Sequence, residues 1–229
     1  IYGNTYTQNF TSGTTISSDY IYTYNNGRLS ENKTYDWLAD GAPYRIVENL
    51  WVWEDNDNNQ VAILKLYPGV TMAFDPGVIL YIGENGDGDA GALQADSVLF
   101  TSVDSSLGWG RIHFRNYTRD DLSFIQNSTI EGADDGVYCE SASPTINQNT
   151  LRNNTDGVEA DNGSRPVISN NTFINNHRPV VIQAYNIDNN IYGNTYTQNF
   201  TSGTTISSDY IYTYNNGRLS ENKTYDWLA

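Results

Sequence analysis

The stretch that decides the fold is Ile146–Leu151, with the sequence INQNTL, which returns as ISNNTF at Ile168–Phe173 and as IYGNTY at Ile191–Tyr196. An earlier copy, IQNSTI, occupies Ile125–Ile130, so the copies follow one another at nearly constant intervals. Each copy has an aliphatic residue, then Asn or Ser, then Thr, then a second apolar residue at the same positions. Because several positions align in all four copies, the segment indicates a structural repeat.

The apolar residues between these copies indicate how one repeat folds. Pairs of apolar residues two positions apart recur at the same offset: Val137 and Cys139, Val158 and Ala160, Val180 and Ile182. Since alternate residues of a strand face opposite sides, each pair points into one interior and successive pairs stack. The column of Asn149, Asn171 and Asn194 predicts an internal ladder of side-chain amides at a bend, where Asn tolerates the left-handed conformation. The sequence predicts an all-β, right-handed parallel β-helix, a solenoid with about 22 residues per coil.

Glycine and proline positions predict the other corners. Gly136 and Gly157, with Pro179 at the equivalent position of the next repeat, are expected to mark one of them. In the first half of the chain, Leu64–Val70 and Met72–Val78 are expected to be short strands with Pro-Gly turns. The first half is thus expected to follow the same plan.

A second repeat is longer and has no mismatch. Residues Ile1–Ala39 recur as Ile191–Ala229, at the other end of the chain. We expect this chain to be a window of a longer tandem array. Residues 1–39 are then the end of a preceding unit and a junction, and residues 40–200 are the β-helix unit. Residues 201–229 are a junction identical to residues 11–39, leading to the next unit.

The composition narrows the possible partners. The net charge of −15 argues against nucleic acid, whose binding requires clustered Lys and Arg, and against anionic lipid surfaces. No apolar run approaches the ~18 residues of a membrane span. The single cysteine, Cys139, excludes a disulfide framework within the unit and is expected to be a small buried side chain in an interior column.

Several stretches resemble a known family. Asp40–Ile46, Leu64–Val70, Phe100–Ser102 and Trp109–Ile112 resemble its opening coils, and Gly136–Cys139, Ser143–Ile146 and Asn171–Phe173 resemble its repeat motif. The family is that of the secreted right-handed β-helix repeat proteins of bacterial and archaeal surfaces, including the disaggregatase-related proteins of methanogens. The resemblance covers about residues 40 to 200 and implies an extracellular or cell-surface location. Such proteins range from carbohydrate-active enzymes to structural surface proteins, so the resemblance leaves the function open.

One group of polar residues is a candidate catalytic cluster. Asp134 and Asp135 lie one coil before Asp156, and His177 and Arg178 lie one coil further on. Neighbouring coils are ~4.8 Å apart, so these side chains are expected to share one outer corner. Paired carboxylates perform glycoside hydrolysis, and β-helix polysaccharide-degrading enzymes place Asp clusters with His and Arg or Lys on such a face. The alternative is a solvated Asp/Gly turn balanced by Arg178.

An acidic loop is a candidate calcium site, although the fold is expected to require no cofactor. Asn85, Asp87, Asp89 and Asp96 place oxygen ligands at relative positions 1, 3, 5 and 12, as in an EF-hand loop. The usual glycine of such a loop is replaced by Ala90. A flexible polar hairpin is the alternative.

Asn-x-Ser/Thr sequons are frequent. They fall at Asn9, Asn32, Asn116, Asn127, Asn153, Asn162, Asn170, Asn199 and Asn222. N-glycosylation of a surface protein and a by-product of the repeat motif are equally good interpretations of any one site.

Three functions follow from these observations. In the first, the unit is a structural β-helical bead of an extracellular filament or cell-surface array, whose partners are further copies of the same unit. The expected inter-unit contacts are the apolar residues of the repeated junction: Tyr210, Ile211, Tyr212, Tyr214, Trp227 and Leu228. In the second, Asp134, Asp135, Asp156 and His177 form the site of a polysaccharide hydrolase or lyase. In the third, the protein is a surface adhesin that binds polysaccharide through exposed aromatic residues such as Trp51 and Trp53.

Overall fold

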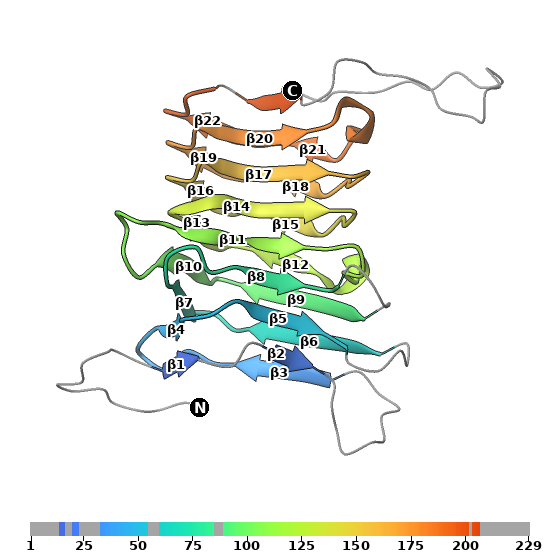
Figure 1. The fold of residues 1–229 in the computed structure, drawn as a ribbon. Coiled ribbons are helices and arrows are strands. Elements are labelled where there is room, and N and C mark those ends of the chain that lie inside the picture. The colour runs from blue at the N-terminus through green and yellow to red at the C-terminus, as the bar shows by residue number, and fades with distance from the viewer. Residues whose placement is uncertain are drawn as a thin grey trace.

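A computed structural model describes residues 14–16, 20–22, 33–54, 60–84, 89–201 and 203–206. The described chain winds into a right-handed parallel β-helix of about seven turns with roughly 25 residues per turn (Figure 1). Each turn contributes one strand to each of three parallel sheets, here called sheets A, B and C. The predicted fold class is confirmed.

The strands of each sheet follow one another along the solenoid axis. Sheet A contains β1 (Thr14–Ile16), β4 (Tyr44–Ile46), β7 (Thr71–Phe74), β10 (Leu99–Ser102), β13 (Thr129–Glu131), β16 (Thr150–Arg152), β19 (Thr172–Ile174) and β22 (Thr195–Thr197). Sheet B contains β2 (Tyr20–Tyr22), β5 (Leu50–Trp53), β8 (Leu80–Ile82), β11 (Trp109–Phe114), β14 (Ala133–Glu140), β17 (Asp156–Asp161), β20 (Arg178–Ile182) and β23 (Thr204–Ile206). Sheet C contains β3 (Lys33–Trp37), β6 (Val61–Leu66), β9 (Ala90–Asp96), β12 (Phe124–Gln126), β15 (Thr145–Asn147), β18 (Val167–Ser169) and β21 (Ile191–Tyr192). Two single-turn 3₁₀ helices, η1 (Asp120–Leu122) and η2 (Ala184–Asn186), are the helices of the described chain.

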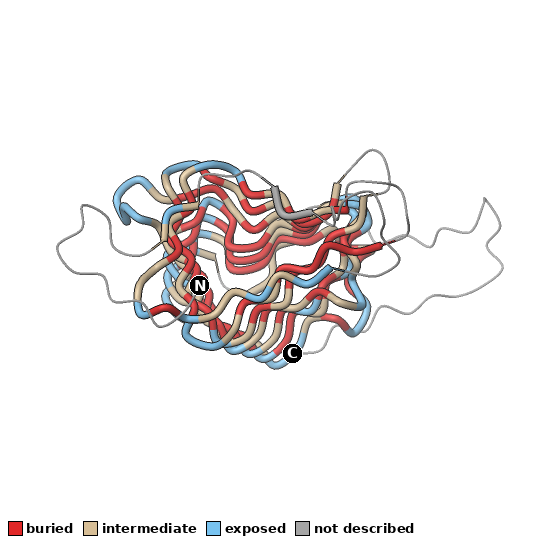
Figure 2. The backbone as a smooth tube through the Cα atoms, turned by 90° about the horizontal axis from the view of Figure 1, so that it is seen from below, coloured by how far each residue is buried: buried red, intermediate tan, exposed pale blue. Residues whose placement is uncertain are grey.

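The core is a set of apolar columns inside the solenoid. Figure 2 shows that buried residues recur along each coil. In sheet A, one column runs through Met72, Phe100, Ile130, Leu151 and Phe173, all fully buried. The predicted columns of sheet B are buried as well, and Cys139 lies among them. The alternation of the sequence thus places one side chain of each pair of neighbours inside and the other outside.

Coil length changes along the chain. In the second half, Ile130 pairs with Leu151 and Phe173 with Tyr196, at the spacings that the repeat predicts. Earlier coils are longer, since Thr14 pairs with Tyr44 and Tyr44 pairs with Met72. The predicted coil length of about 22 residues therefore holds only for the second half, because loops enlarge the earlier coils.

The corners depend on residues in the left-handed conformation. One corner column contains Gly69, Ser97, Asn127, Gln148 and Asn170, with φ of 85°, 58°, 51°, 57° and 55°. The predicted corner at Gly136 and Gly157 is wrong, because both glycines lie inside strands, β14 and β17. There a side chain has no room: a Cβ on Gly157 would lie 2.4 Å from the carbonyl oxygen of Pro179.

The predicted asparagine ladder forms as expected. The side-chain oxygen of Asn171 accepts hydrogen bonds from the backbone N–H and the side chain of Asn149 at 2.9 and 3.1 Å. The Nδ2 group of Asn171 donates to the carbonyl of Ile146 at 2.9 Å. A second ladder, through Asn154, Asn176 and Asn199, has the same pattern at the next corner. Its regular spacing was visible in the sequence, although only the first ladder was predicted.

Candidate functional site

The predicted acidic cluster lies on sheet B, where β14, β17 and β20 run side by side. Asp135 pairs with Asp156, and Asp156 pairs with Arg178, which confirms the predicted register. On the other side of Asp135 stands Arg111 of β11. Four successive coils thus present a column of charges in the order Arg, Asp, Asp, Arg.

Each carboxylate of the column is bound to its own arginine. The Nε atom of Arg178 donates to Oδ1 of Asp156 at 2.7 Å, and a second N–H of Arg178 contacts Oδ2. Arg111 forms ion pairs with buried Asp135 and, at 3.4 Å, with exposed Asp134. Asp135 and Asp156 are only 4% and 2% exposed, so the two guanidinium groups replace the water that these carboxylates lose.

A third carboxylate, Glu159, joins this pair. Carboxylate oxygens of Asp135, Asp156 and Glu159 lie within 4.8 Å of one another. The pKa of Asp135 is raised to about 7, mainly by burial and partly by the charges of Glu159, Asp134 and Asp156, while Arg111 opposes the shift. Burial also raises the pKa of Glu159. Close carboxylates that share one site hold a proton at neutral pH for this reason.

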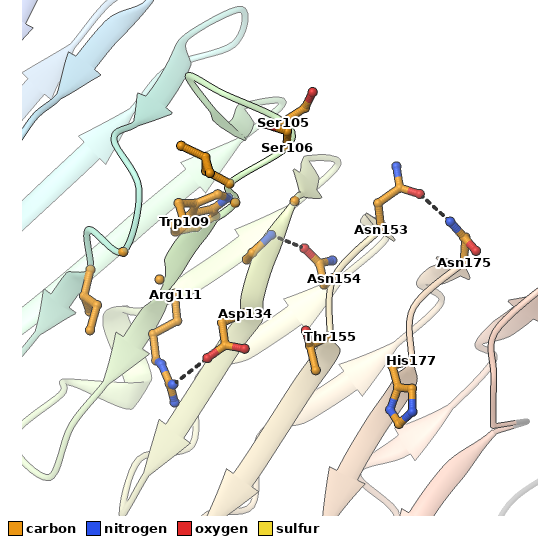
Figure 3. A pocket seen from close by; sticks show the side chains of 17 residues that line it. Ser105, Ser106, Trp109, Arg111, Asp134, Asn153, Asn154, Thr155, Asn175 and His177 are labelled. Carbon is orange, nitrogen blue, oxygen red and sulfur yellow. Dashed lines mark hydrogen bonds and ion pairs between the residues drawn. The ribbon is translucent and has the colours of Figure 1, made fainter.

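Asp134 and His177 lie apart from the buried carboxylates, in an open pocket of about 730 Å³ beside this column (Figure 3). Trp109, Arg111 and Asn153 also line the pocket. Asp134 points to Arg111, whereas the ring of His177 stacks on Phe200 with centroids 4.7 Å apart. The structure therefore divides the predicted cluster into a buried carboxylate group and an open pocket.

This division limits the chemistry of the cluster. A retaining glycosidase uses two carboxyl groups about 5 Å apart, one protonated and one ionised. Asp135 and Asp156 have this proximity, but both are buried and engaged by arginine. A cation at the three carboxylates would compete with the same two guanidinium groups. Asp134, with 63% of its side chain exposed, is the carboxylate that a ligand in the pocket can reach.

Sequence reasoning missed Arg111 and Glu159. Arg111 pairs with Asp135 at a wider spacing than Asp135 with Asp156, because the coil between them is longer and contains a register shift after Arg111. Glu159 lies opposite Tyr138 rather than opposite an acid. Pairing across strands therefore could not reveal Glu159, and the available signal was its position on the same strand as Asp156.

An aromatic row continues the outer face of sheet B towards the N-terminal coils. The rings of Trp51 and Tyr81 stack with centroids 3.8 Å apart, and the Trp51 and Trp53 rings lie 5.0 Å apart. His113 bridges Tyr81 and Tyr138, with ring centroids 5.3 and 4.7 Å away. Trp51 and Trp53 are half-buried rather than exposed, because neighbouring rings of the row cover part of each. This corrects the expectation that both tryptophans present free faces to a glycan.

The predicted calcium loop is not assembled as expected. Asp89 directly precedes β9 and Asp96 is its last residue, so about 23 Å of extended chain separates them at ~3.3 Å per residue. One ion has all its ligands within ~2.6 Å, so these two aspartates cannot share it. Asp96 instead accepts a hydrogen bond from Asn127 at 2.9 Å, which lowers the pKa of Asp96. Asn85 and Asp87 lie outside the described residues.

Four of the six sequon asparagines that the structure describes stand at exposed corners. Asn127, Asn153, Asn162 and Asn170 are exposed and have φ of 51°, 57°, 50° and 55°. A corner needs Asn in the left-handed conformation, often followed by a ladder residue and an outward Thr, and this order itself creates Asn-x-Thr. The repeat thus accounts for the sequons at Asn127, Asn153 and Asn170, and both interpretations of each site stand. Asn116 is exposed too, whereas Asn9, Asn32 and Asn222 lie outside the described residues.

Asn199 differs from the other sequon asparagines. It is half-buried in the second ladder, where its Nδ2 donates to the carbonyl of Phe173 at 3.0 Å and its oxygen accepts from the backbone of Asn176 at 2.8 Å. N-glycosylation modifies Nδ2, so a glycan at Asn199 would compete with the ladder.

The predicted inter-unit contacts cannot be placed. Tyr210, Ile211, Tyr212, Tyr214, Trp227 and Leu228 all lie outside the described residues. Their equivalents in the first coil include Trp37 of β3, which packs against the core and against Tyr44.

Comparison with known proteins agrees with this architecture. The family described as "Right handed beta helix region" matches residues 101–226, more than half of the chain. The chain belongs to the right-handed β-helix family. No curated protein and no solved structure matches this β-helix protein. In the part of the chain that the structure describes, no helix is both long and apolar enough to cross a membrane.

Proposed function

We propose that this β-helix protein is a structural repeat unit of an extracellular filament or cell-surface array, in which units join end to end. The observation that carries the proposal is the identity of residues 1–39 and 191–229, at the two ends of the chain. The first coil of the solenoid is built from residues that recur at the other end.

The two ends of the described solenoid are suited to such a joint. Sheets A, B and C end on β1, β2 and β3 at one side and on β22, β23 and β21 at the other (Figure 1). Terminal strands of parallel sheets offer backbone N–H and C=O groups to a further strand. A neighbouring unit that adds its own strands there would extend the solenoid.

The interior of the unit supports a mechanical role. Asparagine ladders and apolar columns run along the axis, and the Arg-Asp-Asp-Arg column links four coils from β11 to β20. These interactions join each coil to the next along the axis. The partners in this proposal are further copies of the unit and, on the cell surface, polysaccharide; no cofactor is required, and calcium remains a candidate ion for the acidic surface.

Electron microscopy of the native material tests the proposal. Sheet A holds eight strands per unit, and layers ~4.8 Å apart give an axial repeat of ~40 Å. We expect filaments or sheets with this repeat or a small multiple. Isolated particles without axial order under every condition of ionic strength and calcium would remove the array from consideration.

A polysaccharide hydrolase or lyase is the second candidate, favoured by the open pocket that holds Asp134 and Arg111. Asp135, whose pKa is about 7, lies beneath them. The test is cleavage of acidic glycans by the parent, by Asp134→Asn and by the control Asp121→Asn, an exposed acid outside the pocket. Activity lost only in Asp134→Asn would support this candidate, and no cleavage by the parent would reject it.

A further inference from the structure

The segment that occurs twice in the chain has two different placements. Thr14–Ile16 forms β1 and pairs with β4 in sheet A. The identical Thr204–Ile206 forms β23 and pairs with β20 in sheet B. Ile16 and Ile206 both pack against the hydrophobic core. The same sequence is therefore compatible with the edge of either end of the solenoid.

The placement in the first coil is the more extensive of the two. There the segment pairs three times, as β1 with β4, β2 with β5 and β3 with β6. The ring of Trp37 lies 5.0 Å from that of Tyr44, and the Tyr44 hydroxyl donates to the carbonyl of Leu38 at 2.7 Å. The backbone N–H of Tyr67 donates to the carbonyl of Trp37 at 3.1 Å. At the other end, the described pairing of the segment is that of β23 with β20 alone.

We propose that residues 204–229 of one copy form the first coil of a second copy, pairing with its β4, β5 and β6 in place of residues 14–39. The partner is a second copy of this chain, and the docking surface is the edge made by these three strands. Residues 204–229 repeat residues 14–39 without a mismatch, so they supply every group that the first coil uses. This exchange deepens the proposed function, on which it rests, by naming the contact that joins two units.

The chain is long enough for this exchange. The segment 198–203 separates the last residue of β22 from Thr204. An extended stretch of that length spans on the order of 20 Å, several times the ~4.8 Å between layers. The end segment can therefore leave β20 and reach the first layer of a unit stacked on β22. One copy of the segment cannot serve both edges at once, because 204–206 would have to lie in sheet A and sheet B together.

Competition between identical segments decides which copy fills the edge. In the parent chain, residues 14–39 are joined covalently to β4, so their effective concentration at the edge is millimolar. The end segment of another copy must compete with them at its lower free concentration. A substitution that weakens only this first segment shifts the competition to the end segment of another copy. Trp37 and its repeat Trp227 provide a matched pair, because Trp37 contacts Tyr44 and Trp227 would take its place after exchange.

The experiment compares the full-length parent with Trp37→Ala, Trp227→Ala and the double variant by sedimentation velocity over a range of concentrations. Circular dichroism first establishes that each variant keeps its β structure. We expect Trp37→Ala to self-associate at a concentration at least ~10-fold lower than the parent, with species of at least twice 25.6 kDa. The double variant should lose this gain, because the incoming segment also lacks its tryptophan. Trp227→Ala should associate no more readily than the parent.

A cross-link locates the contact. Thr15 lies opposite Arg45 in the first coil, whereas its repeat Thr205 lies opposite Val181 of its own copy. In the Trp37→Ala background, a protein with Arg45→Cys is mixed with a protein that carries Thr205→Cys, and both are treated with a short bifunctional thiol reagent. Exchange predicts a heterodimer joined between residues 45 and 205.

Two results would overturn the exchange. One is association of the double variant as readily as that of Trp37→Ala, and the other is the absence of a link between residues 45 and 205 in associated material. Filaments of the parent that persist under either result would leave the structural function standing with a different joint. Absence of association in the parent and in Trp37→Ala would remove the exchange and the array together.

Discussion

Replacing Asn171 with alanine tests whether the internal ladder holds the coils together. Asn171 is 1% exposed, and its side chain connects three successive coils. Its oxygen accepts from the backbone N–H of Asn149 at 2.9 Å, and its Nδ2 donates to the carbonyl of Ile146 at 2.9 Å and to the side chain of Asn194 at 3.2 Å. Its oxygen also accepts from the side chain of Asn149 at 3.1 Å, and alanine removes all four contacts without changing the outer face of the coil.

The expected decrease in the free energy of unfolding of Asn171→Ala follows from the buried polar groups that lose a hydrogen-bond partner. The buried N–H of Asn149 loses its acceptor, which costs about 1–3 kcal/mol. Loss of the bond to the carbonyl of Ile146 costs about 1 kcal/mol more. The side chain of Asn149 keeps a second acceptor, the carbonyl of Ile125 at 2.8 Å, so it adds little. We expect the free energy of unfolding to fall by about 2–4 kcal/mol, a large part of the ~5–15 kcal/mol that stabilises a typical domain.

Urea denaturation followed by circular dichroism measures this change, with Thr172→Ala as the control. Thr172 is the next residue, half-buried beside β16, and its replacement should cost no more than about 1 kcal/mol. Amide hydrogen exchange adds a local measurement, since the N–H of Asn149 should exchange faster in Asn171→Ala alone. Equal destabilisation by the two variants, with unchanged exchange at Asn149, would refute the argument that the ladder stabilises the solenoid.

Three further outcomes test other parts of the structure. Because the pKa of Asp135 is raised to about 7, the folded state binds one more proton than the unfolded state between pH ~4 and ~7. The parent protein therefore loses stability as the pH rises through this window. Asp135→Asn does not titrate, so its free energy of unfolding should exceed that of the parent increasingly from pH ~5 to pH ~8 in parallel denaturations. Gly157→Ala, whose Cβ would lie 2.4 Å from the carbonyl oxygen of Pro179, should lower the free energy of unfolding in urea by about 3 kcal/mol. The control Gly163→Ala should lower it by about 1 kcal/mol, because the space there is open and only the positive φ is unfavourable. Burial raises the pKa of the Cys139 thiol, so iodoacetamide should modify the native protein at least ~100-fold more slowly than the urea-unfolded protein, as followed by mass spectrometry.

The fold was predictable where each residue has one structural task. Ile146, Asn149 and Leu151 recur at one spacing because each coil needs an inner apolar residue, a ladder amide and a second inner residue at the same height. Earlier coils meet the same need with other residues, such as Gly69 at the corner where later coils have Asn or Gln. The period is lost there because Pro-Gly turns and loops of different length separate the strands. The number of coils could therefore be estimated, but not the length of each.

The pairing of the candidate site residues across strands could be predicted from the sequence, but the burial of their side chains could not. The regular spacing of Asp135, Asp156 and Arg178 along the repeat fixed their pairing. Burial of Asp135 depends on its partner Arg111, whose coil has a different length. Gly136 also allows the backbone of β14 to approach Gly157 within the solenoid. The spacing of residues along the sequence shows neither the longer coil of Arg111 nor the close backbone approach at Gly136. The sequence therefore indicated a solvated corner where the structure has buried, ion-paired aspartates.

The two ends of the chain show where local sequence ceases to determine structure. Thr-Thr-Ile presents an isoleucine to the interior and threonine to the outside, a pattern that any strand of this solenoid accommodates. The segment is β1 where the neighbouring edge is β4, and it is β23 where the neighbouring edge is β20. Its partner is thus chosen by the adjacent coil, because parallel pairing through backbone groups is nearly independent of the outward side chains. A segment of this kind can pair with the edge of its own unit and also with the first coil of another unit, which is the property that a joint between repeated units requires.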